Sequence, residues 1–248
     1  MTESSGFLAR DGGQRLAWRR IEGAGPTVVW LGGFRSDMAG TKAQALADWA
    51  QASGRAYLRF DYFGHGESSG DFAEGTITRW RADALAVLAE LVEGDVVLIG
   101  SSMGGWIACL TALAAPERVR AMVLVAPAPD FTEKLMAPEI PPEGRAALER
   151  DGVWLRPSEY GEPYPISATL LEDGARWSIL TSEPISITAP VRILQGGQDP
   201  DVPWRHALEL AQALKGDDVV FTLIKDGDHR LSRPQDLARL IAAVEELS

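Results

Sequence analysis

The pattern that most directly indicates chemistry is the pentapeptide at residues 100–104, whose sequence GSSMG matches the motif G-x-S-x-G. Apolar residues 96–99 predict a buried strand before it, and the periodicity of residues 103–115 predicts a helix after it. A serine at the centre of such a turn is exposed, and the flanking glycines allow the close backbone approach that the turn requires. We therefore predict that Ser102, rather than Ser101, is a nucleophile. The alternative is a glycine-rich turn with an idle serine.

A serine hydroxyl is a weak nucleophile at neutral pH and needs a base within hydrogen-bonding distance. The chain has three histidines. After a serine on this type of turn, an acid and then the catalytic histidine follow along the chain. His65 precedes Ser102 and is expected to be structural, while His206 falls on a partly exposed face of a predicted helix. His229 lies on a loop after the last predicted strand, so we predict that it is the base.

The acid that orients the histidine is expected on the loop after the last strand but one, where residues 195–203 have the sequence QGGQDPDVP. Asp199 and Asp201 both lie on this loop, and both also fit ordinary turn chemistry. Asp228 is a third carboxylate, next to His229. Neighbouring side chains on an extended loop point apart, so Asp228 is not expected to reach the ring. The residues alone leave Asp199 and Asp201 as alternatives.

Acyl transfer to a serine also needs donors for the oxygen that becomes negatively charged. One donor is expected from the backbone N–H of Met103, the residue after the nucleophile. The second is expected from the loop at residues 32–35, GGFR, where the Phe34 N–H is the candidate. Arg35 follows directly, so its guanidinium is expected near the mouth of the site, where it could pair with a carboxylate on the leaving group. The alternative is a surface arginine without a ligand.

The elements that must position these residues alternate between strand and helix. A hairpin is expected at residues 6–20, with its turn at 11–13. Strands are predicted at 27–31, 55–61, 96–100, 120–126, 191–195 and 219–225, and helices at 41–53, 76–92, 103–115, 204–214 and 234–247. This alternation predicts an α/β fold, with a mostly parallel, twisted sheet flanked by helices on both faces.

The alternation is interrupted at residues 127–165, which hold more than half of the 15 prolines. Prolines at this density disfavour a long helix or a central strand. The segment nevertheless keeps large apolar side chains, which a disordered linker would lack: Phe131, Leu135, Met136, Trp154 and Tyr160. We predict one domain over residues 1–248, with an inserted cap at about 127–185 that selects an apolar acyl group.

Composition excludes several classes of function. A net charge of −11 without a basic stripe argues against nucleic-acid binding, and the apolar runs are too short to span a bilayer. The N-terminal residues resemble neither a signal peptide nor an Arg- and Ser-rich transit region, so a cytoplasmic location is expected. Cys109 is the one cysteine, which excludes an intrachain disulfide. We find no metal-ligand spacing and no phosphate-binding loop, so neither a metal nor a cofactor is expected.

With these residues in place, the chain resembles the α/β-hydrolase superfamily over essentially its whole length. Within it, the chain is similar to the mitochondrial abhydrolase-domain-containing thioesterases, a family of palmitoyl-protein thioesterases and acyl-glucuronide esterases. The segments that carry the likeness are GTKA at 40–43, RFDY at 59–62, WRAD at 80–83, GSSMGGW at 100–106, GVW at 152–154, DPDVPW at 199–204 and DHR at 228–230. By position, the resemblance assigns a triad to Ser102, Asp199 and His229, and thus favours Asp199 over Asp201.

The resemblance implies hydrolysis of a carboxylic ester or thioester through an acyl-enzyme on Ser102, without a cofactor. A small molecule or an acylated protein is the expected substrate, with Arg35 and Trp154 among its contacts, and a monomer or homodimer is the expected state. Other reactions use the same fold, namely perhydrolysis and carbon–carbon bond cleavage. A ligand-binding module that retains the triad is the third alternative.

Overall fold

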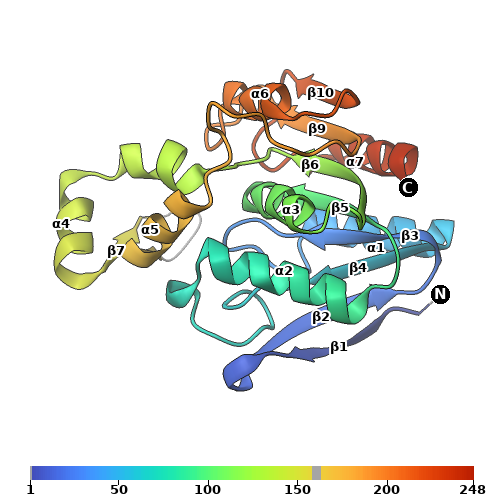
Figure 1. Ribbon diagram of the computed structural model, residues 1–248, viewed down its shortest axis with the longest axis horizontal. Coiled ribbons are helices and arrows are strands. Elements are labelled where there is room, and N and C mark those ends of the chain that lie inside the picture. The colour runs from blue at the N-terminus through green and yellow to red at the C-terminus, as the bar shows by residue number, and fades with distance from the viewer. Residues whose placement is uncertain (1, 158–162) are drawn as a thin grey trace.

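The computed structural model describes residues 2–157 and 163–248, and an eight-stranded sheet forms its centre (Figure 1). The order across the sheet is β1-β2-β4-β3-β5-β6-β9-β10. The strands are β1 (Ser4–Ala9), β2 (Arg15–Ile21), β3 (Ala24–Leu31), β4 (Arg55–Phe60), β5 (Val96–Ser101), β6 (Val119–Val125), β9 (Val191–Gly196) and β10 (Val219–Ile224). β1 and β2 form the expected hairpin, and β2 pairs antiparallel with β4. All further pairings in this sheet are parallel, which confirms the predicted mostly parallel sheet.

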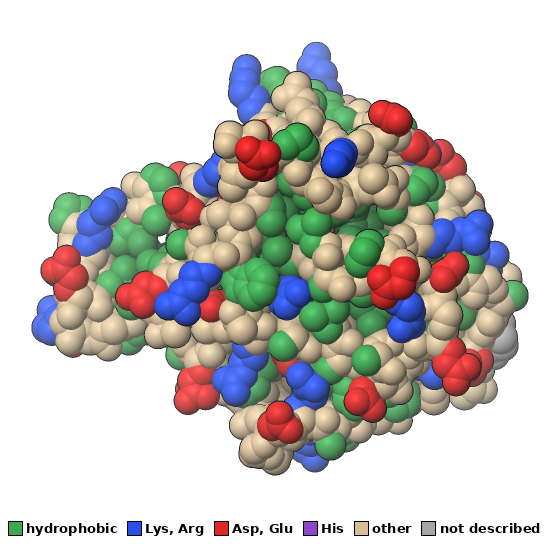
Figure 2. Space-filling model, viewed as in Figure 1, with side chains coloured by type: hydrophobic (Ala, Val, Ile, Leu, Met, Phe, Trp, Pro, Cys, Tyr) green, Lys and Arg blue, Asp and Glu red, His purple; other side chains and the backbone are tan. Residues whose placement is uncertain are grey.

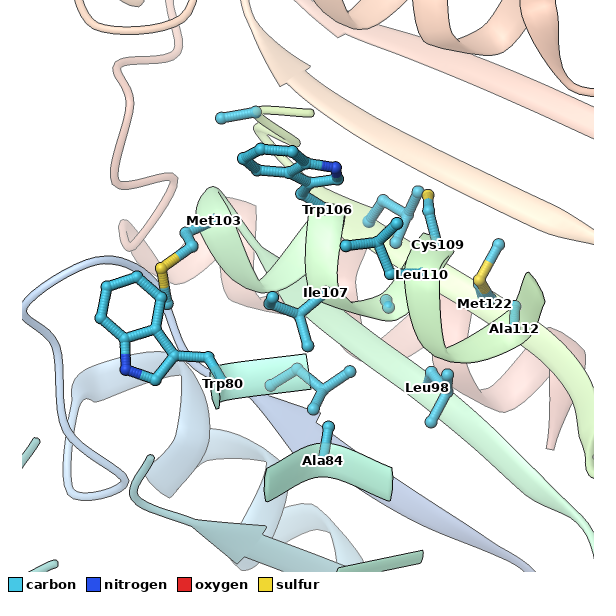
Figure 3. Close-up of a cluster of buried hydrophobic side chains, with 14 of the residues drawn as sticks. Trp80, Ala84, Leu98, Met103, Trp106, Ile107, Cys109, Leu110, Ala112 and Met122 are labelled. Atoms are coloured by element: carbon cyan, nitrogen blue, oxygen red, sulfur yellow. The ribbon is translucent and has the colours of Figure 1, made fainter. Parts of the chain in front are cut away.

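Helices cover both faces of the sheet. α1 (Thr41–Ser53) and α7 (Pro234–Leu247) pack on one face, and α2 (Ile77–Leu91), α3 (Met103–Ala114) and α6 (Trp204–Ala213) pack on the other. The larger core lies under α2 and α3, where Trp80, Trp106 and Ile107 are fully buried (Figure 3). Cys109 is buried in the same cluster, as expected for a core cysteine.

Between β6 and β9 the chain leaves the sheet and forms a lobe that projects beyond the carboxyl ends of the strands (left in Figure 1). We call residues 127–180 the excursion. Its elements are the π-helical turn η3 (Thr132–Met136), the 3₁₀ turn η4 (Ala137–Glu139), α4 (Pro142–Asp151), β7 (Val153–Arg156), β8 (Tyr164–Ser167) and α5 (Ala168–Arg176). Pro142 occupies the first turn of α4, where a missing N–H costs nothing, so this proline starts a helix of 10 residues.

The apolar side chains of the excursion pack against the main core. Phe131 and Met136 are buried, and Leu135 and Trp154 are partly buried against the same cluster. Tyr160, which we expected among them, lies outside the described residues. The burial of these side chains explains why a proline-rich segment is ordered here.

A fully buried carboxylate, that of Asp130, joins the start of the excursion to its end. Asp130 accepts hydrogen bonds from the backbone N–H groups of Ile179, at 2.9 Å, and Leu180, at 2.8 Å. A second tie joins α5 to the first turn of α2, because the carboxylate of Asp173 accepts from both the N–H and the hydroxyl of Thr78, each at 2.7 Å. The two ends of the excursion are thus joined to each other, and α5 is joined to α2.

Candidate active site

The predicted nucleophile sits on a strained turn between β5 and α3. Ser102 has φ 54° and ψ −119°, which L-residues rarely adopt and which costs on the order of 1–3 kcal/mol. The glycines allow this turn, because a Cβ on Gly100 would collide with the backbone of Gly104, and a Cβ on Gly104 would collide with the Leu31 carbonyl. Ser101 is buried whereas Ser102 is partly exposed, so a substrate can reach Ser102 alone of the two.

The structure brings His229 and Asp199 together. Asp199 follows β9 and His229 follows β10, and the two loops meet because these parallel strands are neighbours. The Nδ1 atom of His229 lies 2.8 Å from Asp199 Oδ2. The carboxylate is fully shielded from solvent, while 24% of the His229 side chain is exposed. Asp199 therefore holds the ring at Nδ1, and the ring is partly open to solvent. His229 follows β10 and Ser102 follows β5, so both residues lie at the carboxyl edge of the parallel strands.

Further donors fix the Asp199 carboxylate. Its Oδ1 accepts the backbone N–H groups of Asp201 and Val202, both at 2.9 Å, and its Oδ2 accepts the amide of Gln195 at 3.1 Å. Gln195 is fully buried at the end of β9. The contribution of Gln195 was not predicted from the sequence, although a polar side chain near the end of an apolar strand was a signal that could have indicated it.

The competing residues have other roles. The side chain of Asp201 is exposed, and Asp228 accepts the N–H of Leu231 at 2.9 Å. His206 was expected on a partly exposed face and is instead buried, with Nε2 2.7 Å from the Pro129 carbonyl. The local periodicity of α6 could not predict this burial, because the excursion supplies the covering residue. His65 is buried on a loop after β4, which agrees with a structural role.

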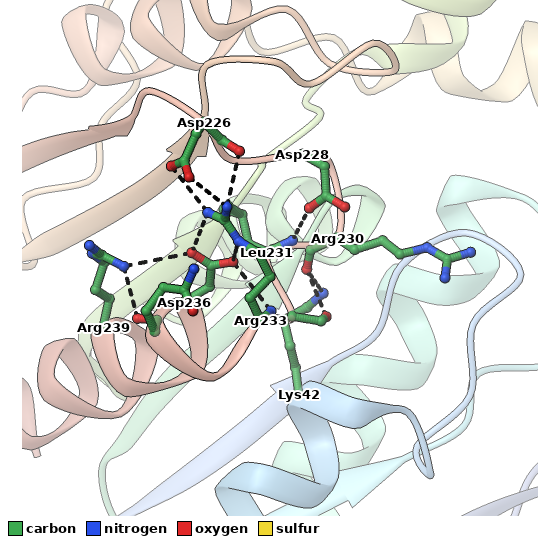
Figure 4. Close-up of polar contacts among 10 residues, drawn as sticks. Lys42, Asp226, Asp228, Arg230, Leu231, Arg233, Asp236 and Arg239 are labelled. Atoms are coloured by element: carbon green, nitrogen blue, oxygen red, sulfur yellow. Dashed lines mark hydrogen bonds and ion pairs between the residues drawn. The ribbon is translucent and has the colours of Figure 1, made fainter.

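Polar contacts also hold the loop that carries His229 (Figure 4). The ammonium of Lys42, on α1, donates to the Arg230 carbonyl at 2.5 Å. Arg233 pairs with Asp226 on the loop and with the buried Asp236 on α7, each at 2.7 Å. Burial lowers the pKa of Lys42 to about 8, although the nearby Asp228 carboxylate opposes that shift. These contacts restrain the backbone before and after His229.

Of the two predicted oxyanion donors, one follows Ser102 directly in the sequence and the other lies on the loop after β3. The loop after β3 is close to the nucleophile, since a Cβ on Gly33 would lie 3.5 Å from Ser102 Cβ. Met103 is the first residue of α3, whose N–H has no partner within the helix. Among the described residues, neither the Met103 nor the Phe34 N–H has a hydrogen-bond acceptor. Both groups are therefore available to a substrate oxygen.

Aromatic rings surround Phe34. Its ring centroid lies 4.8 Å from that of Phe72, 5.5 Å from Phe131 and 6.0 Å from Tyr164 of the excursion. The exposed Arg35 places its guanidinium over the rings of Phe72 and Tyr164, at 5.4 and 5.3 Å. The loop after β3 and the excursion are thus in direct contact, and their contact surface is apolar and aromatic beside Ser102.

Trp154 is partly buried and packs within the excursion. Its indole packs against α4, where a Cβ on Gly144 would approach it to 2.9 Å. Its contacts within the described residues do not place it beside Ser102, so its assignment as a substrate contact stays a prediction. Among the described residues, Asp199, Asp201 and His229 form a group with potential metal-ligand atoms within 4.8 Å of one another. The hydrogen bond between Asp199 and His229 accounts for most of that proximity.

A strained serine between strand and helix, together with a His–Asp pair on the loops of the last two parallel strands, is typical of α/β-hydrolases. Residues 17–240 match the alpha/beta hydrolase family, and the chain belongs to that family. The predicted fold and superfamily are thereby confirmed.

Several known proteins are similar to the chain in sequence and structure over nearly its full length. The mitochondrial palmitoyl-protein thioesterase ABHD10 of Bos taurus is 37% identical, over 98% of this chain and 80% of the relative. The mouse ABHD10 structure superimposes with a TM-score of 0.89 at 36% identity, over 98% of each chain. A protein of Agrobacterium vitis S4, described only as a hydrolase, gives a TM-score of 0.95 at 43% identity, over 100% of this chain and 99% of the other. The resemblance expected from the short segments is confirmed.

The comparisons correct one prediction. A cytoplasmic location was expected, but the names of the ABHD10 relatives place those proteins in mitochondria. Composition and the pattern of the first residues were the grounds for the expectation. In the described ranges, no helix combines the length and apolar character needed to cross a membrane. On the face in Figure 2, the described basic side chains are interspersed with acidic ones.

Proposed function

We propose that the protein hydrolyses acyl thioesters and esters through an acyl-enzyme on Ser102. One observation carries the proposal: the 2.8 Å contact of His229 Nδ1 with the buried Asp199 carboxylate, at the edge of the sheet where Ser102 lies. An aspartate on Nδ1 fixes the tautomer in which Nε2 is free to accept a proton. The thioesterase names of the relatives support the choice of bond.

In the proposed reaction, His229 Nε2 takes the proton from Ser102 Oγ as the hydroxyl attacks the acyl carbonyl. The Phe34 and Met103 N–H groups stabilise the oxyanion, and each such donor is worth roughly 3–4 kcal/mol in the transition state. His229 then protonates the leaving thiol or alcohol, and water releases the acid by the same steps. Within the described residues, no hydrogen bond joins Ser102 to His229, and we expect it to form with substrate, as is common in unliganded enzymes.

A panel of p-nitrophenyl esters and matched thioesters of increasing acyl length tests this function. The aromatic surface around Phe34 favours an apolar acyl group, and each buried methylene adds up to about 0.8 kcal/mol. We therefore expect kcat/KM to rise with acyl length until the site is filled, and then to fall. An optimum at acetyl would contradict an apolar acyl site. No turnover of any member would favour the ligand-binding alternative, and turnover only with peroxide or with diketones would favour the other chemistries.

A second set of esters tests the role of Arg35. Its members are matched in pairs, in which the leaving alcohol is either neutral or carries a carboxylate. The guanidinium lies at the exposed margin of the aromatic surface, where it can pair with an anion without leaving Tyr164. In Arg35→Ala, kcat/KM for the carboxylate-bearing esters is expected to fall more than kcat/KM for the neutral esters. An equal loss on both would show that Arg35 fastens the excursion and does not select charge.

The pH dependence of activity is expected to report on His229. The base must be neutral to accept the Ser102 proton, so kcat/KM should rise with pH along a single acid limb. Burial lowers the pKa of His65 to about 4, so this ring stays neutral in mildly acidic solution, and burial also lowers the pKa of His206. A limb between mildly acidic and neutral pH is the result expected for a histidine base. Burial raises the pKa of the Asp83 carboxyl to about 6, so Asp83→Asn is the control that separates its ionisation from that of the base. A flat profile over that range would argue against a histidine base.

A further inference from the structure

His65 links the loop that carries the Phe34 N–H to the body of the protein. We call residues 32–38 the oxyanion loop. His65 is 4% exposed, its Nε2 lies 3.2 Å from the Arg35 backbone nitrogen, and its Nδ1 lies 3.0 Å from the Phe63 carbonyl. We propose that His65 is a positioning residue, which holds the Arg35 peptide so that the preceding Phe34 N–H points at the substrate oxygen. This inference rests on the proposed function and adds a residue to its machinery.

The two contacts of His65 fix its protonation. The Phe63 carbonyl can only accept, so Nδ1 carries the proton and donates it. Nε2 is then an acceptor and receives the Arg35 N–H. A protonated imidazole would have no lone pair for Arg35, but burial and the nearby Arg35 guanidinium lower the pKa of His65 to about 4. The neutral ring is the form that can connect the two backbones.

Phe63, whose carbonyl binds His65 Nδ1, is itself held by α2. The Phe63 carbonyl also accepts from the Trp80 indole at 3.1 Å, and the Phe63 N–H donates to the Asp83 carboxylate at 2.9 Å. Trp80 and Asp83 lie on α2, and the His65 ring also packs edge-on against Trp80, with centroids 5.3 Å apart. The WRAD segment at 80–83, which the proposed reaction does not use, thus has a physical role: it anchors the partner of His65.

The end of the oxyanion loop is held in the same way by the RFDY segment at 59–62. The Met38 carbonyl accepts from the buried Arg59 guanidinium at 3.0 Å, and the Met38 N–H donates to Asp61 at 2.7 Å. Between these supports, Arg35 has φ 56°, a backbone conformation that is unfavourable for arginine. The loop would relax from this conformation without a partner for the Arg35 N–H, and His65 supplies that partner.

Three variants separate the two hydrogen bonds. His65→Phe keeps a ring and loses both bonds. His65→Asn places an amide nitrogen near the position of Nδ1, so it keeps the bond to Phe63 and loses the bond to Arg35. His65→Gln reaches the position of Nε2 with an amide oxygen and keeps the bond to Arg35. We expect kcat to fall about 10- to 100-fold in the phenylalanine and asparagine variants. This loss is smaller than the loss on complete removal of one oxyanion donor, because the Phe34 N–H is displaced and not removed. In the glutamine variant kcat should largely recover.

A second readout distinguishes positioning from a general loss of stability. An alkyl boronic acid, which forms a tetrahedral adduct on serine, should bind His65→Asn more weakly in proportion to the loss of kcat. A non-hydrolysable thioether analogue, which resembles the ground state, should bind with unchanged affinity. His206→Phe is the matched control, because it removes another buried histidine contact, to Pro129. It should lower the melting temperature while the ratio of the two affinities stays at the wild-type value.

Several outcomes would overturn the inference. It fails if His65→Asn retains wild-type kcat, if glutamine restores no more activity than phenylalanine, or if the boronate and thioether affinities fall equally. These outcomes are distinct from failure of the proposed function, which would appear as an inactive wild-type protein on the ester panel.

Discussion

Replacement of Ser102 by alanine is expected to lower kcat by on the order of 10⁶-fold, the loss seen when a comparable triad loses its serine. Ser102 is the partly exposed hydroxyl on the strained turn between β5 and α3. Alanine removes the nucleophile and leaves the backbone strain in place, so neither folding nor substrate affinity should change greatly. Steady-state kinetics on the preferred ester measures the effect.

Ser101→Ala is the matched control for this variant. Ser101 is 7% exposed at the end of β5, and its neighbour carries the unusual φ. A fluorophosphonate should label the wild type and Ser101→Ala on Ser102, and should not label Ser102→Ala. Peptide mapping that finds the adduct on Ser101 would overturn the assignment.

Asp199→Asn is expected to lower kcat by roughly 10⁴-fold, because the histidine would settle in the wrong tautomer. The surroundings of Asp199 dictate this result. One oxygen accepts the N–H groups of Asp201 and Val202, so an asparagine oxygen is held on that side. The amide NH₂ must then face Gln195 and His229. A donor on that side forces His229 to present a lone pair at Nδ1 and a proton at Nε2, where the Ser102 proton should go.

Asp201→Asn tests the alternative acid, since Asp201 is exposed and contributes its backbone N–H to Asp199. An asparagine at this position keeps that N–H, so kcat should change far less than in Asp199→Asn. A larger loss in Asp201→Asn than in Asp199→Asn would move the orienting role to Asp201. Circular dichroism of both variants would show that the comparison is between folded proteins.

The sequence was most informative where a local signal sets an element's limits. Helix α1 ends at Ser53 because Gly54 adopts φ 73°, and α7 begins at Pro234, so both predicted ranges match the structure. The strands of the large sheet and the other predicted helices form near their predicted positions, and their bounds differ from the prediction by a few residues. β3 begins at Ala24, three residues early, because the chain around Gly25 pairs with the start of β4. Such pairing involves residues far away in sequence, which a local pattern does not report.

The candidate site followed from the sequence where chain order and motif sufficed, as for Ser102 and His229. The residues that hold the site in place could not be predicted from the sequence. Gln195 and His65 act through partners that only the folded chain brings close, and the elements of the excursion depend on burial against the core. A proline count could not locate α4, since the physical effect of Pro142 depends on which turn of a helix it occupies.

The hydrogen bonds of Asp130 bring the two ends of the excursion together. Because Asp130 clasps Ile179 and Leu180, residues 131–178 begin and end at one point beside the sheet. Doubling the length of a flexible closed loop costs only about 0.6 kcal/mol, so changes of length in this stretch are expected to be tolerated where they spare the side chains that pack on the core and on Phe34, such as Phe131. Transplanting the corresponding stretch from a relative, joined at this clasp, is thus a modular route to altered substrate preference without rebuilding the catalytic apparatus.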